Sequence, residues 1–467
     1  MLTTKEAAEV LGISVRRVTS LIESGVLSAQ KFGRSWMVDE ASVRLRASTE
    51  HRPGRPLPSS SPHTGQFVLM NRHHPVARFT YHFQAGEVSH IEPLEDIAWK
   101  PFGIGRREKT PNRYDFAEWI RHRTIPGMRP NLPLALRQLN AESSVALMFE
   151  TWGLSLSDPY WFKPEEEDLD WVDINYFDNG YEEAFGNFML SGSFNGSELG
   201  TKSRIGKPVI THSPDIATNG MLQKTWIRRD GKDCLIKGGL GNENREPFNE
   251  RLACKLFERL LEPDEFVSYS VMERNGRSYS SCENMISRET ELIPAADVLT
   301  AFAITGGRDL HAYYLRALQE LAVPNAQQLI DKMIVVDHLM ANFDRHTHNF
   351  GLIRNAETLD NYRITPLFDH GCGFYAWATT AELERGPYFW DSHPFCEYPS
   401  QQLALVQDLT WYDPSSLNGF ADDIAEELGE NPEIDDRFVA AVQRQTEYQI
   451  ATVNRLAAER GLIVAGW

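Results

Sequence analysis

Two aspartates and one asparagine in the C-terminal half are spaced for chemistry on a phosphate group. Asn349 follows Asp344 by five residues, and Asp369 follows Asn349 by twenty, within the stretches 337–351 and 364–371. Metal-assisted phosphoryl transfer needs one carboxylate to orient a hydroxyl. It also needs an Asn and a second Asp to hold Mg²⁺ against the nucleotide phosphates. The spacing predicts this chemistry. The alternative without chemistry is a helix that ends in a polar loop, followed by a strand and a turn.

Several histidines near this stretch raise the alternative of a zinc site, namely His338, His346, His348 and His370. Positions 346 and 348 are two residues apart, so they do not face one way on a helix. We therefore expect His346, together with Asn342, to brace the loop by hydrogen bonding.

Lys237 ends an apolar strand that we predict at residues 233–237, after a first strand at 223–228 and an Arg-Asp-Gly turn. A kinase places such a lysine on the α- and β-phosphates and pairs it with a Glu from the next helix. Glu250 is near the start of the following helix, whose apolar face is Phe248, Leu252, Leu256 and Leu260. The alternative for Lys237 is a charge that keeps an edge strand soluble.

A loop of small residues precedes the first of these strands and consists of Ala217, Thr218, Asn219 and Gly220. Loops of this kind can lay backbone N–H groups on phosphates. After the helix, strands at 267–271 and 278–282 flank the hairpin turn Asn275-Gly276. The element order is that of a kinase N-lobe, and it predicts that backbone groups of Glu283 and Met285 face the adenine.

Residues 1–48 predict a helix, a tight turn, a second helix and a two-stranded wing, the geometry that places a helix N-terminus in the major groove of DNA. Arg16 and Arg17 begin the second helix, and Lys31 and Arg34 lie on the wing. The segment has seven Lys and Arg against five Asp and Glu, a balance of 7 − 5 = +2 in a chain of net charge −18. It therefore predicts DNA binding, with a small helical interaction module as the alternative.

The composition of the chain indicates a linker and the cellular setting. Residues 49–65 are rich in Pro, Ser and Gly and predict a flexible linker. No apolar run is long enough for a membrane helix, and the N-terminus does not read as a signal peptide. The five cysteines are scattered without a C-x-x-C pair, so we expect a reducing, cytoplasmic setting.

The C-terminal four hundred residues resemble the HipA-type serine/threonine kinases. The motif is N-F-D-R-H-T-H-N-F at 342–350, followed by F-D-H-G at 368–371. The first 48 residues resemble the excisionase/MerR-type winged helix-turn-helix through T-x-x-E-A-A-x-x-L-G-I-S. The resemblance implies an α+β, bilobal protein-kinase-like fold with a small N-terminal winged helix-turn-helix domain. It divides the chain into a DNA-binding domain (1–48), the linker (49–65), an accessory subdomain (66–200), a kinase N-lobe (201–290) and a helical C-lobe (291–467).

The HipA resemblance also implies roles for the residues. Asp344 would be the catalytic base, Asn349 and Asp369 would hold Mg²⁺, Lys237 would contact the phosphates of ATP, and Glu250 matches the family's glutamate. In that family a serine of the phosphate loop is autophosphorylated, which ejects the loop; Thr218 is the nearest hydroxyl here. The expected partners are a protein substrate with a Ser or Thr hydroxyl, DNA through residues 1–48, and an antitoxin or operon partner.

Two alternative functions remain open. One is a nucleotide-sensing transcriptional regulator with an inactive kinase fold. The other is a lipid or small-molecule kinase, because D-R-H-x-x-N also resembles the catalytic loop of phosphoinositide kinases. The sequence lacks a basic amphipathic element that would face a membrane.

Overall fold

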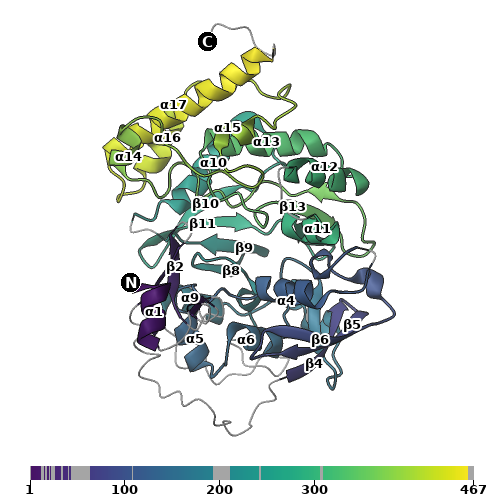
Figure 1. The fold of residues 1–467 in the computed structure, drawn as a ribbon. Helices are drawn as coiled ribbons and strands as arrows, with labels where there is room; N and C mark the ends of the chain where they lie inside the picture. The colour runs from purple at the N-terminus through teal and green to yellow at the C-terminus, as the bar shows by residue number, and fades with distance from the viewer. Residues whose placement is uncertain are drawn as a thin grey trace. The chain divides into compact units, whose positions relative to one another are not determined.

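The computed structural model describes residues 2–11, 15, 18–19, 22, 27–32, 35–39, 42–43, 64–107, 109–192, 211–240, 243–304 and 309–460. The chain forms two compact units (Figure 1). The first comprises residues 1–96, 117–155 and 160–223, and the second comprises 97–116, 156–159 and 224–467. Arg16, Arg17, Arg34 and most of the linker lie outside the described residues, as does the side chain of Lys31.

The N-terminal segment of the first unit is a helix on a small sheet. Helix α1 (Thr4–Leu11) follows β1 (Leu2–Thr3), and β2 (Ala29–Phe32) and β3 (Ser35–Val38) complete a sheet of order β1-β3-β2. Thr3 and Glu6 cap the helix reciprocally, because each backbone N–H donates to the side chain of the other, at 2.7 and 3.2 Å. Small and branched apolar residues form its core: Ala7, Ala8, Val18, Ile22, Leu27, Ala29, Val38 and Val43.

The rest of the first unit contains a four-stranded antiparallel sheet of order β6-β5-β4-β7. Its strands are β4 (Thr64–Asn71), β5 (His74–His82), β6 (Glu87–Pro93) and β7 (Tyr160–Pro164). Phe67 and Phe79 on the sheet pack against Phe149 from a helix, with ring centroids 4.4 and 6.3 Å away. The helical elements are α5 (Leu132–Gln138), α6 (Ser144–Glu150), α7 (Trp171–Ile174), α8 (Tyr176–Asn179), α9 (Ala184–Ser191) and η4 (Pro214–Ala217), and α4 (Arg113–His122) crosses the unit boundary.

The second unit contains the sheet that the sequence predicted around Lys237. Strands β8 (Lys224–Arg229), β9 (Lys232–Lys237), β10 (Tyr269–Arg274) and β11 (Arg277–Glu283) have the order β10-β11-β9-β8. Strand β10 begins two residues later than predicted and runs to the turn. Asn275 and Gly276 form this turn with φ of 53° and 74°, as a tight hairpin requires. Helix α10 (Glu246–Leu260) lies between β9 and β10 in the chain.

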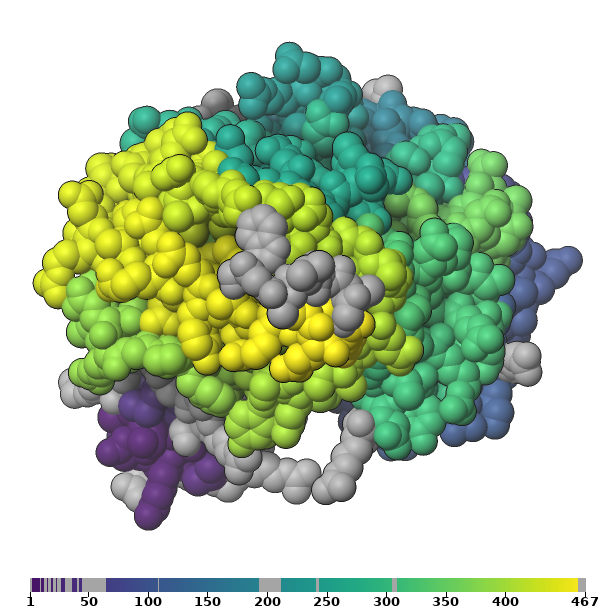
Figure 2. All heavy atoms as spheres, turned by 90° about the horizontal axis from the view of Figure 1, so that it is seen from above, coloured from purple at the N-terminus to yellow at the C-terminus, as the bar shows by residue number. Residues whose placement is uncertain are grey.

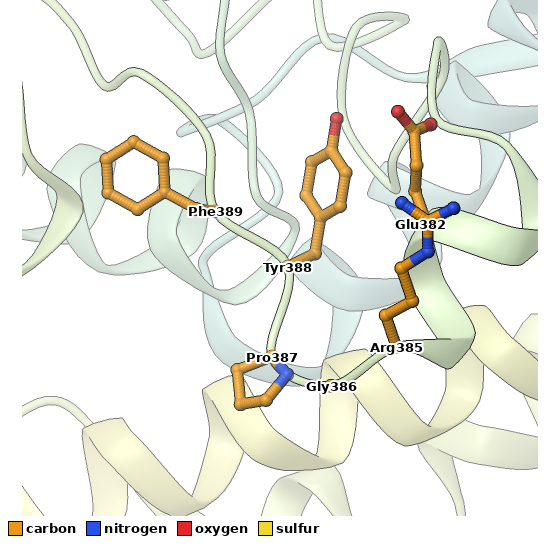
Figure 3. Close-up of a pocket in the computed structure, with 6 residues that line it drawn as sticks. All are labelled: Glu382, Arg385, Gly386, Pro387, Tyr388 and Phe389. Atoms are coloured by element: carbon orange, nitrogen blue, oxygen red, sulfur yellow. The ribbon is translucent and has the colours of Figure 1, made fainter.

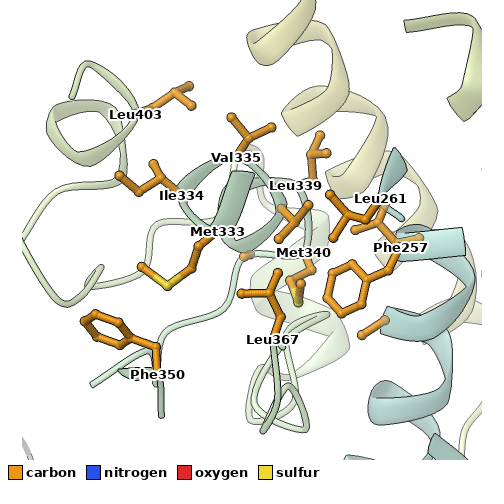
Figure 4. Packing of buried hydrophobic residues seen from close by; sticks show 14 of the residues in the cluster. Phe257, Leu261, Met333, Ile334, Val335, Leu339, Met340, Phe350, Leu367 and Leu403 are labelled. Atoms are coloured by element: carbon orange, nitrogen blue, oxygen red, sulfur yellow. The ribbon is translucent and has the colours of Figure 1, made fainter. Parts of the chain in front are cut away.

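The remainder of the second unit is mainly helical and shares its core with α10. Figure 4 shows Phe257 and Leu261 beside Leu339 and Met340, which come from the C-terminal end of α13 (Ala326–Leu339) and the residue after it. These side chains are all buried and belong to one cluster, so the helix that carries Glu250 and the helix that leads to Asp344 are packed together. The residues of α16 and α17, yellow in Figure 2, form much of the face of this unit that is seen from above.

The other elements of the second unit are η1 (Ile97–Trp99), η2 (Phe102–Ile104), α11 (Ala295–Ala301), α12 (Leu310–Glu320), α14 (Thr380–Glu384), α15 (Pro399–Leu403), η5 (Pro414–Leu417), α16 (Phe420–Gly429) and α17 (Asp436–Glu459). A sheet of order β12-β13-β14 joins β12 (Thr290–Pro294), β13 (Gly351–Asn355) and β14 (Arg363–Ile364). In the described part of the chain, no helix has the length and apolar character needed to cross a membrane.

Candidate active site

The ammonium group of Lys237 lies between two carboxylates. Its Nζ is 2.8 Å from Oδ1 of Asp369 and 3.2 Å from Oε1 of Glu250, and it donates to the hydroxyl of Tyr269 at 3.4 Å. Lys237 is 4% exposed at the end of β9, which is an inner strand of its sheet. The alternative of an edge-strand charge is therefore wrong, because this lysine is neither at an edge nor exposed.

The three charged groups hold one another ionised. Burial disfavours the charge of Lys237, but Asp369 and Glu250 outweigh burial and raise its pKa well above the usual value. Burial likewise opposes ionisation of Asp369, but Lys237 and Lys224 outweigh it and hold the pKa of that carboxyl well below its usual range. The same balance between burial and Lys237 lowers the pKa of Glu250. At neutral pH these three groups are therefore one ammonium and two carboxylates.

Glu250 connects helix α10 to the turn that carries Asp369. Its second oxygen, Oε2, accepts a hydrogen bond from the backbone N–H of His370 at 2.8 Å. The backbone N–H of Asp369 in turn donates to the hydroxyl of Tyr269 at 3.3 Å. Asp369 has a φ of 63°, a left-handed conformation that is uncommon outside glycine. These contacts hold the turn so that the Asp369 carboxylate meets Lys237.

A short loop after α13 presents Asp344. The side chain of Asn342 donates to Oδ1 of Asp337 at 2.9 Å, and its carbonyl oxygen accepts from the backbone N–H of Asp344 at 3.1 Å. The Asn349 side chain donates to the backbone carbonyl of Asp344 at 2.9 Å. Asn342 thus lies where a brace was predicted, and Asn349 closes the loop from the other side.

The predicted brace His346 makes a smaller contribution. It is exposed, and its Nδ1 accepts from the backbone N–H of His348 at 3.2 Å. Burial raises the pKa of the Asp344 carboxyl, and His346 is the neighbour that opposes this rise most. His346 also lowers the pKa of the Asp369 carboxyl, but by less than Lys237 and Lys224 do. In the described part of the chain no three His, Cys, Asp or Glu side chains are grouped to hold a metal ion.

Sequence reasoning missed Arg345, whose side chain is the main connection of this loop. Arg345 is fully buried, and its guanidinium binds both oxygens of Asp337 at 2.8 and 2.9 Å. Its Nη1 donates to the carbonyls of Asn349 and Phe368, each at 2.7 Å. One guanidinium therefore holds the end of α13, the loop and the residue before Asp369. The sequence feature that could have indicated this role is the position of Arg345 directly after Asp344 in the motif.

The environment of Asp344 suits a proton acceptor. Burial raises the pKa of the Asp344 carboxyl, and the charge of Asp369 adds to that rise while His346 opposes it. A carboxylate with a raised pKa takes a proton from a hydroxyl more readily than an ordinary one. Asp344 and Asp369 are therefore two carboxyl groups whose surroundings shift their pKa values in opposite directions, as an acid–base group and a charged ligand require.

Lys224 is a second cation of the site that the sequence did not reveal. It lies directly opposite Lys237 in the β8–β9 pairing, so both side chains are on one face of the sheet. Lys224 is 7% exposed, and its charge contributes to the low pKa of Asp369. Two like charges opposite each other are unfavourable unless anions are near. The pair marks this face of the sheet as a place for anionic groups.

The end of β11 and the segment after it carry Glu283 and Met285, and the backbone there is bonded to β9. The N–H of Asn284 donates to the carbonyl of Asp233 in β9 at 2.8 Å. Because successive residues of a strand point their backbone groups to opposite sides, those of Glu283 point away from β9. The Glu283 side chain binds Lys232 at 2.6 Å on the exposed surface, and Met285 is half-buried.

The predicted phosphate loop belongs to the first unit. Ala217 ends η4, and the Thr218 hydroxyl donates to the carbonyl of Pro214 at 2.8 Å. Asn219 is exposed, and Gly220 has a φ of 103°. The side-chain oxygen of Asn219 accepts a hydrogen bond from the backbone N–H of Gly220 at 2.7 Å. The loop has the short residues and the left-handed glycine of a backbone anion site.

The donor groups fit a nucleotide with a divalent cation. Mg²⁺ prefers oxygen ligands, and Asp369 and Asn349 supply a carboxylate and an amide oxygen. The amide nitrogen of Asn349 is engaged with Asp344, which leaves the oxygen as the group available to a metal.

The surface of the second unit also has a pocket of about 310 Å³ away from these groups. Figure 3 shows the ring of Tyr388 between Phe389 on one side and Glu382 with Arg385 on the other. Gly386 and Pro387 complete the lining, so among the described residues none of the predicted site residues takes part.

Comparisons with known proteins bear on both parts of the chain. Residues 1–47 match the protein-family model described as "Helix-turn-helix domain". A comparison with the sequences of curated proteins found no match. The structure of HipA from the toxin–antitoxin system of Shewanella oneidensis MR-1, in complex with HipB and its operator DNA, is similar with a TM-score of 0.51 and 13% sequence identity; the match covers 83% of this chain and 97% of that chain. The proinflammatory kinase CtkA of Helicobacter pylori is matched with a TM-score of 0.39 and 15% identity, over 51% of this chain and 95% of that chain. The family-model match and the likeness to the HipA structure confirm the resemblance and the fold class that the sequence predicted: the chain has an α+β, protein-kinase-like fold of the HipA type with a helix-turn-helix domain at its N-terminus.

Proposed function

We propose that the protein is an ATP- and Mg²⁺-dependent serine/threonine protein kinase of the HipA type, with a fused DNA-binding domain. The observation that carries this proposal is the contact of Lys237 with both Glu250 and Asp369. A kinase needs this lysine–glutamate pair and the metal-binding aspartate in place together. A fold without activity has no need to keep the buried charges of Lys237 and Glu250 next to the partly buried charge of Asp369, since buried ion pairs contribute little net stability.

Each site residue has a role in this proposal. Asp344 accepts the proton of the substrate hydroxyl, and Asn349 and Asp369 hold the metal ion. Lys237, oriented by Glu250, binds the phosphates of ATP, and Lys224 adds a second positive charge on the same face of the sheet. When bound, Mg²⁺ would neutralise the negative charge of the transferred phosphoryl group. Arg345, Asn342 and His346 keep the loop in place.

Two backbone segments complete the nucleotide site that we propose. The amides of Ala217, Thr218, Asn219 and Gly220 are assigned to the phosphates, and the backbone of Glu283 and Met285 to the adenine. Thr218 is the candidate for autophosphorylation, since it is the hydroxyl of this loop. Phosphorylation would remove the hydrogen that it donates to the Pro214 carbonyl.

The N-terminal domain suggests control of the protein's own operon. The HipA structure that this fold resembles is a complex with HipB and operator DNA. Here we propose that residues 1–48 bind DNA through Arg16, Arg17, Lys31 and Arg34, tethered by the linker 49–65 in a cytoplasmic protein. An antitoxin or operon partner is part of this proposal, as is the division of the kinase into residues 66–200, 201–290 and 291–467.

Quantitative phosphoproteomics tests the proposed substrate class. Cells that express the wild type are compared with cells that express Asp344→Asn. The matched control is Asp331→Asn, which changes a buried carboxylate on α13 that accepts from Gln327 and from the backbone of Gln407 and Asp408. We expect Ser or Thr sites that are phosphorylated with the wild type and Asp331→Asn and lost with Asp344→Asn. Identical phosphoproteomes would count against a protein kinase, and ATP consumption with a metabolite or lipid would then favour a small-molecule kinase.

A further inference from the structure

Arg129 is a buried cation of the first unit that none of the predicted sites includes. It is 1% exposed and lies in the turn before α5. Its Nε donates to the carbonyl of Gly220 at 2.9 Å, and its Nη2 donates to the carbonyls of Thr218 and Gly220 at 2.5 and 2.7 Å. All three hydrogen bonds go to the loop that follows η4.

Packing alone does not explain an arginine at this position. Burial lowers the pKa of Arg129 to about 10, and the buried carboxylate of Asp215 opposes that effect, so the side chain is charged at neutral pH. A buried charge costs free energy that an apolar side chain of similar size would not. The hydrogen bonds to the two carbonyls are therefore the feature that requires explanation.

These hydrogen bonds fix the orientation of two peptide groups. In a trans peptide the carbonyl of one residue points opposite to the N–H of the next. Because the carbonyls of Thr218 and Gly220 point at Arg129, the N–H groups of Asn219 and Met221 point away from it. Within the described residues neither N–H has an acceptor, and both residues are exposed. Gly220 permits this arrangement through its φ of 103°.

We infer that Arg129 is a positioning residue, which turns the backbone N–H groups of Asn219 and Met221 outward so that they bind the phosphate groups of a nucleotide. Convergent backbone N–H groups in a turn form concave anion sites. The inference rests on the proposed kinase function, since it takes a nucleotide as the occupant of the loop. Arg129 then contributes to the affinity for phosphates and not to the affinity for adenosine.

Binding of Mg²⁺–AMP-PNP and of adenosine, measured by calorimetry on the full-length protein, separates these contributions. For Arg129→Met we expect the affinity for AMP-PNP to fall about tenfold, the effect of weakening two hydrogen bonds to a charged group. The affinity for adenosine is expected to stay within about twofold of the wild type. Arg129→Lys keeps the charge but not the fork of donors. Its affinity for AMP-PNP is expected to lie between those of the wild type and Arg129→Met.

Arg123 provides the matched control. It is a second buried arginine of the same unit, 8% exposed, and it also donates to two backbone carbonyls, those of Gly153 and Tyr160, at 2.9 and 3.2 Å. Arg123→Met should lose similar stability and keep the wild-type ratio of the two affinities.

Asn219→Pro keeps the inference testable if Arg129→Met fails to fold. It removes one of the two N–H groups, and the extended Thr218, with φ of −116° and ψ of 113°, accepts a following proline. It should reproduce the selective loss of AMP-PNP affinity. An unchanged ratio in Arg129→Lys and Asn219→Pro overturns this inference alone. Failure of the wild type to bind AMP-PNP overturns the kinase proposal as well.

Discussion

Arg345 and Asp337 form a two-pronged ion pair that is almost completely enclosed, with Nε–Oδ2 and Nη2–Oδ1 distances of 2.8 and 2.9 Å. The side chains are 0% and 4% exposed. The nitrogen that Asp337 does not use binds the carbonyls of Asn349 and Phe368. This pair therefore sets the separation between the loop of Asp344 and the turn of Asp369, and both would lose their position without it.

Arg345→Met should destabilise the protein by about 3–5 kcal/mol, because it leaves the Asp337 carboxylate buried without a partner. Urea unfolding measures this loss, and Mg²⁺–AMP-PNP binding should fall with it. Arg354→Met is the control, since Arg354 forms an equally buried pair with Glu291 between β12 and β13. Arg354→Met should lower the free energy of unfolding by a similar amount, while the protein that remains folded binds AMP-PNP with the wild-type affinity. Equal nucleotide binding by the two folded variants would contradict the role of Arg345.

Lys237→Met should destabilise the protein most at neutral pH. In the wild type the pKa values of Asp369 and Glu250 are held below their unfolded values of 3.8 and 4.5. Their pairing with Lys237 therefore contributes stability above those values, which is lost as the pH falls through the folded pKa values. Without Lys237 the two carboxylates repel and resist ionisation. The loss should be about 3–5 kcal/mol at pH 7 and shrink below about pH 4. A pH-independent difference in urea midpoints would contradict this.

Asp344→Asn should stabilise the protein at neutral pH while it abolishes activity. The folded pKa of Asp344 is raised above 3.8, so the wild type loses stability as the pH rises from 3.8 through the folded value. Asparagine removes that cost, and a gain on the order of 1 kcal/mol is usual for such sites. Denaturant unfolding at pH 7 and below pH 4 checks the sign, because the gain should disappear in acid. A loss of stability at pH 7 would show that the Asp344 charge is favourable in the fold.

Arg16→Ala combined with Arg17→Ala should weaken DNA binding and reduce its dependence on salt. Each lost phosphate contact lowers the slope of log K against log salt by about 0.9. Titration of a random-sequence duplex at several salt concentrations measures the slope. Arg437→Ala removes the same kind of charge from an exposed position on α17 and serves as the control. If both variants have the wild-type slope, these two arginines do not contact DNA.

Local patterns in the sequence were enough to predict the elements of the site. An apolar strand that ends in Lys237, the amphipathic spacing of α10 and the Asn275-Gly276 turn all depend on neighbouring residues, and each appears in the structure within two residues of its predicted position. The general chemistry of kinases predicted that Lys237 pairs with Glu250, and the two side chains are in contact. The contact of Lys237 with Asp369 was not predicted.

Contacts that depend on register or on distant segments could not be predicted in this way. Lys224 joins the site only because β8 and β9 pair with Lys224 opposite Lys237. Tyr269 reaches Lys237 from a strand 32 residues away in the sequence. Arg129 binds carbonyls about 90 residues further along, and nothing near it in the sequence indicates this contact.

The central claim is that Asp344 takes the proton of a hydroxyl that attacks ATP, and transfer of label from [γ-³²P]ATP tests it most directly. The purified wild type, Asp344→Asn and the control Asp331→Asn are incubated with Mg²⁺, with cell extract as the source of substrate. The account predicts label on protein with the wild type and Asp331→Asn, and a loss of at least about a hundredfold in rate with Asp344→Asn. Equal labelling by the wild type and Asp344→Asn would contradict it.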